Sequence, residues 1–172
     1  MLFQRMLRAA RLDASLYKEL RREPLALTQG LVILFLACLA VAVGAGIREV
    51  GEGHSFGRGI AGGLVVMPGL WLIQAASAFF LGRVAIDPGQ DKGSGKDLLA
   101  AILFSTAPGV FFLAFALPGD LGFWAATIVR FWMVFATAMA VRGTMDVPYY
   151  RGLIAAAPGF LLSQVLPGLS AA

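Results

Sequence analysis

The segment LGFWAATIVRFWMVFATAMAV, residues Leu121 to Val141, decides the fold of this chain because it is long and apolar enough to cross a bilayer as one helix. Its only charged residue, Arg130, lies near the middle of the segment. An arginine at the centre of a membrane span costs roughly 2.5 to 3.5 kcal/mol on insertion scales, so protein groups, water or lipid must solvate it. Arg130 is therefore the first candidate functional residue.

The rest of the chain has the composition of a membrane protein. Of its 172 residues 59% are hydrophobic and 14% charged, which is more apolar surface than a soluble core can bury. The apolar runs are continuous, which excludes the alternating pattern of a membrane β-barrel. We predict an all-α integral membrane bundle of five transmembrane helices in one domain, residues 25–172. The predicted spans are 25–47, 60–82, 98–117, 121–141 and 153–169.

Residues 1–23 precede the first span and form a separate amphipathic segment. At 100° per residue its apolar side chains fall on one side and its basic side chains on the other. This pattern predicts a cytoplasmic interfacial helix that lies flat on the bilayer, with its basic face near anionic lipid headgroups. We expect Tyr17 to anchor this helix at headgroup depth. The alternative is that Tyr17 and Glu19 form a docking point for a cytoplasmic partner.

The distribution of basic residues predicts the orientation. A cytoplasmic N-terminus places eleven Lys and Arg residues on the inner side and only Arg48 and Arg58 on the outer side. Basic residues in short cytoplasmic loops determine topology, so we expect the N-terminus inside and the C-terminus on the opposite side. The net charge of +4 thus marks a membrane face, and no nucleic-acid partner is expected.

Three of the predicted spans contain a Pro-Gly dipeptide, at Pro68, Pro108 and Pro158. Proline removes one helical hydrogen bond and leaves the carbonyl four residues earlier without its donor, so each helix is expected to be kinked or locally broken. In lipid the freed carbonyls need partners from neighbouring helices, hydroxyl groups or water. These faces are therefore expected to point into the bundle.

Pro108 lies at nearly the same predicted depth as Arg130. The sequence predicts that the guanidinium of Arg130 donates to oxygens around this break: the carbonyl of Phe104, with Ser105, Thr106 and Gln164 as further acceptors. None of the predicted spans contains a carboxylate, so we expect no buried ion pair. Two interpretations of Arg130 remain open, a structural clamp on the third-span break and a binding site for an anion or lipid headgroup.

Several short motifs resemble the short bacterial members of the Yip-domain family, which are relatives of the Ypt/Rab-interacting membrane proteins. The matching residues are Leu12–Leu20 (LDASLYKEL), Glu23-Pro24, Gln29, Ala107-Pro108-Gly109, Trp132-Met133, Ala140-Val141-Arg142 and Asp146. The resemblance implies five spans, a cytoplasmic N-terminus, a location in the bacterial cytoplasmic membrane and a non-enzymatic role. Arg142 and Asp146 match the family pattern. Their four-residue spacing predicts a helix-end pair, either as a structural staple or as a cytoplasmic docking point.

The preferred functional hypothesis is a non-enzymatic membrane protein that organises the bilayer or a membrane protein complex. Its expected partners are the bilayer, anionic headgroups at the N-terminal helix, and a membrane-protein partner or a second copy of the chain. The alternative is a small transporter or channel subunit for an anion or lipid that uses Arg130 and the proline-containing helices. No recognisable spacing places a base beside a nucleophile, and we expect no catalytic residue, metal site or cofactor.

Overall fold

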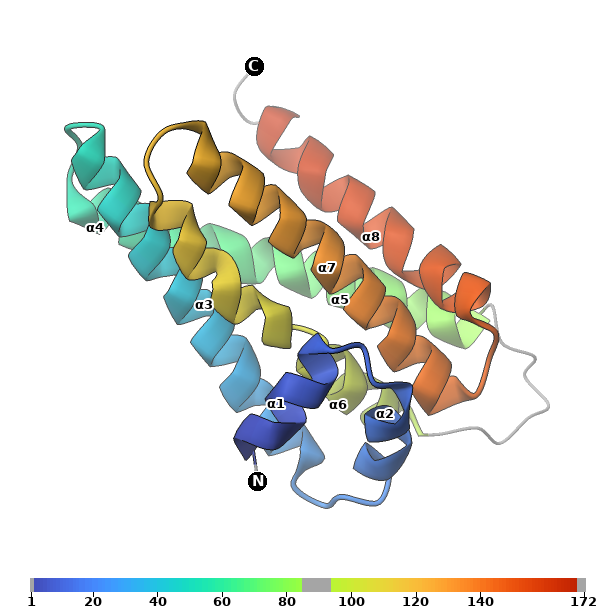
Figure 1. Cartoon of the computed structure of the whole chain (residues 1–172). Coiled ribbons are helices and arrows are strands. Elements are labelled where there is room, and N and C mark those ends of the chain that lie inside the picture. Colours follow the sequence, from blue (N-terminus) through green and yellow to red (C-terminus); the bar gives the residue numbers. More distant parts are fainter. Residues whose placement is uncertain (1, 85–93, 170–172) are drawn as a thin grey trace.

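The computed structural model describes residues 2–84 and 94–169, and this part of the chain is helical without a strand (Figure 1). The elements are α1 (Leu2–Ala10), α2 (Ala14–Leu20), α3 (Ala26–Gly51), α4 (Phe56–Ala61), the π-helix η1 (Gly62–Val66), α5 (Met67–Val84), α6 (Gly95–Phe104), the 3-10 helix η2 (Ala107–Ala116), α7 (Asp120–Met145) and α8 (Tyr149–Leu169). The prediction of an all-helical chain is confirmed.

Four helical segments of the described chain are long and apolar enough to cross a membrane. They are Ala26–Gly51, Phe56–Gly82, Gly95–Ala116 and Asp120–Met145. The element α8 covers the fifth predicted span and packs against α5 and α7. Between α3 and α7 lies η2, which contacts both helices (Figure 1).

The N-terminal segment differs from the single flat helix that the sequence predicts. It folds into two short helices, α1 and α2, which pack across one end of the bundle (Figure 1). The chain turns at Leu12, whose φ of 61° is left-handed, and the carboxylate of Asp13 then caps α2 by accepting from the amide of Ser15. A long amphipathic pattern is thus divided by a turn.

The apolar side of this helix pair is covered by protein. Leu16, Tyr17 and Leu20 are buried in one cluster with Ile33 of α3 and Phe104 of α6. The side chain of Tyr17 has no exposed surface, so it contacts protein and not lipid headgroups, while its predicted depth in the bilayer stays a prediction. Periodicity identified the apolar face but not the surface that covers it.

Two of the three Pro-Gly sites interrupt the α-helix as predicted. The π-helix η1 ends immediately before Met67-Pro68, and α6 ends at Phe104 so that Pro108 starts the 3-10 helix η2. The third helix, α8, runs as unbroken α-helix through Pro158, so no local break occurs there.

Small residues bring the helices close together. A Cβ atom built on Gly59 would lie 2.5 Å from the backbone of Ala45, and one on Gly63 would collide with Ala42. Gly59 and Gly63 thus allow a close contact within the chain, between α3 and the α4–η1 segment.

Candidate functional site

Ion pairs fasten α1 to α2 at the N-terminal end of the bundle. The guanidinium of Arg8 donates to Asp13 at 2.8 Å and to both carboxylate oxygens of Glu19 at 2.7 Å. Hydrogen bonds from Ser15 and Arg8 lower the pKa of Asp13 to about 2, and the bond from Arg8 lowers the pKa of Glu19. The predicted candidate Glu19 thus holds the helix pair together, although 58% of its side chain remains exposed.

Three further hydrogen bonds hold this helix pair, and two of them connect it to α3 and α7 of the bundle. Arg5 donates to Gln29 of α3 and to Glu23, both at 2.6 Å. The indole of Trp132 in α7 donates to the carbonyl of Ala10 at 2.7 Å, at the end of α1 where helical carbonyls lack partners. The apolar side chains of α2 pack against the bundle, and these charged and polar contacts fix the orientation of α1 and α2 on it.

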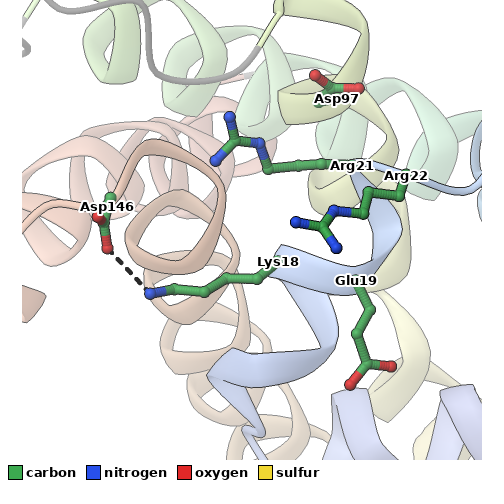
Figure 2. A pocket seen from close by; sticks show the side chains of 6 residues that line it. All are labelled: Lys18, Glu19, Arg21, Arg22, Asp97 and Asp146. Carbon is green, nitrogen blue, oxygen red and sulfur yellow. Dashed lines mark hydrogen bonds and ion pairs between the residues drawn. The ribbon is translucent and has the colours of Figure 1, made fainter.

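Beside α2 the surface is hollowed into a cavity of about 650 Å³ (Figure 2). The residues that line it are Lys18, Glu19, Arg21, Arg22, Asp97 and Asp146. Lys18 forms an ion pair with Asp146 at 3.1 Å, and the Asp97 carboxylate accepts from the backbone of Ser94 in a capping box. Arg21 and Arg22, in contrast, have no carboxylate partner within residues 2–84 and 94–169, and Figure 2 shows their side chains extending into the hollow.

The candidate Asp146 is the left-handed C-cap of α7 and lies at this hollow through its pair with Lys18. Arg142 is exposed on the last turn of the same helix. The proposed helix-end pair between these two residues stays a prediction. The sequence missed the pairing with Lys18, which lies 128 positions away in the chain, because no local spacing reveals it.

The hydroxyl groups near Pro108 serve the helix break itself. Ser105 donates to the carbonyl of Ile102 at 2.7 Å and lies 3.0 Å from the hydroxyl of Thr137, and Thr106 donates to the carbonyl of Leu103 at 2.7 Å. The carbonyl that Pro108 leaves without its helical donor belongs to Phe104, and neither of these bonds reaches it, so the predicted partners of that carbonyl stay a prediction. The fourth proposed acceptor for Arg130, the side chain of Gln164, lies outside the described residues.

Arg130 lies near the middle of α7 and lines a different site, which extends toward the end of the bundle that carries α4. This second cavity has a volume of about 370 Å³ and lies between α3, the α4–η1 segment, η2 and α7. Its other charged residues are Glu49 and Arg58, and neither Ser105 nor Thr106 lines it.

The predicted spans contain no carboxylate, but the first helix is longer than its predicted span. The apolar run ends at Ile47, but α3 continues to Gly51, so Glu49 lies on the last turns of a candidate membrane helix. Its Oε2 is 3.1 Å from Nδ1 of His54 and 3.7 Å from Nε of Arg58. Hydropathy alone does not reveal that the helix continues through Glu49. The sequence does indicate it, because no helix-breaking residue lies between Ile47 and Gly51.

The ligand atoms of Glu49, Glu52 and His54 lie within 4.8 Å of one another, which is close enough for a shared cation. We assign no metal to them, since Glu52 is paired with Arg48 at 2.9 Å and Glu49 faces Arg58. Each of the two carboxylates therefore already has an arginine as its ionic partner.

Comparison with known proteins gives no relative for this arrangement. No family model, no curated protein and no solved structure matches the chain.

Proposed function

We propose that this chain is a non-enzymatic, multi-pass integral membrane protein that organises anionic lipid around itself. Four apolar helices support the membrane location. We include α8 as the fifth span because its 21 residues extend about 32 Å as helix, close to the hydrocarbon thickness of about 30 Å. The excess of basic residues at the α1–α2 end favours a cytoplasmic position for that end in a bacterial cytoplasmic membrane.

The observation that carries this proposal is the hollow beside α2. Two adjacent arginines, Arg21 and Arg22, face a space of about 650 Å³ without a carboxylate partner in the described chain. The lining as a whole is balanced, with three basic and three acidic residues, but Asp146 is paired with Lys18 and Glu19 with Arg8. A phosphodiester headgroup is therefore the anionic partner that we propose for the two arginines. Each basic side chain near an anionic membrane surface contributes about 1 kcal/mol, so the pair favours anionic over neutral lipid.

We extend the proposal to a relationship with the Yip-domain family. Residues that carry the resemblance gather at this same end: Asp13 caps α2, Glu23 and Gln29 both accept from Arg5, and Trp132 holds the end of α1. Motifs far apart in sequence thus serve one structural purpose, which favours a shared fold over chance matches.

Lipid enrichment tests the proposal. The protein is reconstituted in vesicles of equal phosphatidylglycerol and phosphatidylcholine, extracted in mild detergent, and its retained lipids are counted by native mass spectrometry. We expect retained phosphatidylglycerol to exceed phosphatidylcholine, and the preference to fall severalfold in the Arg21→Gln/Arg22→Gln variant, because about 1 kcal/mol per charge corresponds to about fivefold.

The matched control is Arg11→Gln/Arg151→Gln, which removes two exposed charges that do not line the hollow. This control is expected to keep the preference. If both double variants lose the preference for phosphatidylglycerol equally, the preference depends on the net charge of the protein and not on a specific site at Arg21 and Arg22.

Transport of an anion or lipid is the second candidate function, and the cavity that Arg130 lines is the observation that favours it. A flux measurement in liposomes that contain the purified protein distinguishes the two functions. If the protein moves an anion or a lipid across the membrane and Arg130→Ala abolishes this movement, transport replaces the first proposal.

A further inference from the structure

The cavity around Arg130 combines an apolar wall with a small group of charges. Its apolar side is formed by Val41, Phe112, Phe115 and Ala126, from three different elements. Two arginines and one glutamate complete the lining, so the cavity carries one net positive charge. A volume of about 370 Å³ is within the range of small-molecule sites.

Two of the three charged residues of the cavity lie side by side. Arg58 is 67% exposed and so marks the mouth, and its Nε is 3.7 Å from Oε2 of Glu49 on the last turns of α3. Arg130 begins deeper, but α7 starts at this end of the bundle (Figure 1), and long helical side chains lean toward the helix N-terminus. This general tendency favours a guanidinium of Arg130 on the side of the mouth, in the same cavity that Glu49 and Arg58 line.

We infer that this cavity binds one anionic phospholipid of the adjacent leaflet, with its phosphodiester between Arg58 and Arg130 and part of one acyl chain against Phe112 and Phe115. The single net charge of the cavity matches the single charge of a phosphodiester. The apolar wall matches an acyl chain but not a free inorganic anion. The inference rests on the proposed membrane location, and it is independent of the lipid site at Arg21 and Arg22.

The glycines of the α4–η1 segment offer a steric test that leaves every charge in place. Gly59 and Gly63 touch α3 and tolerate no side chain. Gly62 also lines the cavity, but a Cβ built on it meets no atom within 4 Å. A leucine at position 62 is therefore expected to fold and to occupy the space of the ligand.

The experiment titrates purified protein in a non-ionic detergent with 1-oleoyl-lysophosphatidylglycerol, a one-chain probe with a phosphodiester, and detects binding by native mass spectrometry. We expect one probe molecule per chain, with at least about tenfold weaker binding of the zwitterionic lysophosphatidylcholine. Both Arg130→Gln and Gly62→Leu are expected to weaken binding at least about tenfold. The matched control Gly57→Leu lies on α4 in open space outside the cavity, and it is expected to bind as the wild type does.

Equal binding by Gly62→Leu and Gly57→Leu would overturn the inference, as would equal binding of the two probes. If Arg130→Gln fails to fold, the comparison of lysophosphatidylglycerol binding by Gly62→Leu and Gly57→Leu still tests the inference. The Arg21→Gln/Arg22→Gln variant is expected to keep this site, so failure here is distinguishable from failure of the proposed function.

Discussion

At the scale of single residues, Tyr17 links the N-terminal helix pair to the bundle by packing. Its hydroxyl lies 3.5 Å from the carbonyl of Ala136, at the limit of a hydrogen bond, while its side chain has no exposed surface. We expect Tyr17→Ala to lower the free energy of unfolding by about 3 to 5 kcal/mol and Tyr17→Phe by less than about 1 kcal/mol. Thermal unfolding in detergent measures both, and equal losses would show that the hydroxyl dominates.

Glu49 contributes the only negative charge among the residues that line the cavity of Arg130. Replacing it with glutamine raises the net positive charge there, so we expect Glu49→Gln to bind lysophosphatidylglycerol severalfold more tightly. Glu52→Gln is the control, because Glu52 has the same charge but does not line the cavity. Weaker binding in Glu49→Gln would mean that Glu49 positions the arginines instead of competing with the ligand.

The sequence identified Arg130 because an arginine in an apolar run is costly wherever it points. It placed Glu49 and Arg58 in the outer connection and not in one cavity with Arg130, since hydropathy marks the apolar core of a span and not the end of its helix. It also placed Tyr17 on the correct apolar face but in lipid, because periodicity does not distinguish lipid from protein as the covering surface.

At the scale of elements, the ion-pair network of Arg8 determines how α1 and α2 respond to acid. The folded pKa of Asp13 is lowered from 3.8 to about 2, and that of Glu19 is also lowered. A lowered folded pKa contributes stability that is complete above the unfolded value and is lost as pH falls through the folded value. The contribution of Asp13 is therefore expected to disappear between about pH 4 and pH 2.

The measurement compares thermal unfolding of the wild type and Arg8→Gln in detergent across this pH range. The wild type is expected to be more stable at pH 6, and the difference is expected to shrink as the carboxylates are protonated. Arg11→Gln, which removes an exposed arginine of the same region, is expected to show no such convergence. A stability difference that stays constant down to pH 2 would contradict the role of these carboxylates.

The proline-containing elements show which part of helix geometry a sequence specifies. Pro108 predicts a break, but the form of the break depends on tertiary contacts, including the hydroxyl of Thr137 on α7 and the approach of Gly109 to Ala37. In α8 the Pro158-Gly159 pair lies in continuous helix, where Gly159 packs against Gln74 of α5. Gly69 of the first pair, in contrast, has no atom within 4 Å of an added Cβ, so a Pro-Gly pair by itself determines neither a break nor a close contact.

At the scale of the whole molecule, the two cavities lie toward opposite ends of the bundle, so the orientation decides which leaflet each of them meets. The basic residues favour the α1–α2 end inside, and the cavity of Arg130 then faces the outer leaflet. The distribution of basic residues in the sequence therefore predicts on which side of the membrane each end of the bundle lies. The position of each cavity depends on which helices pack together, and residue spacing does not predict that.

Cysteine labelling in intact cells tests this orientation, because the single native cysteine, Cys38, is buried and gives little background. Ser55 lies in the exposed turn between α3 and α4, and Arg11 is exposed at the end of α1. We expect Ser55→Cys to react with a membrane-impermeant maleimide in intact cells and Arg11→Cys to react only after permeabilisation. The reverse pattern would move the Arg21–Arg22 hollow to the outer side and the Arg130 cavity to the inner leaflet, while labelling of both in intact cells would contradict a bundle that spans the membrane between them.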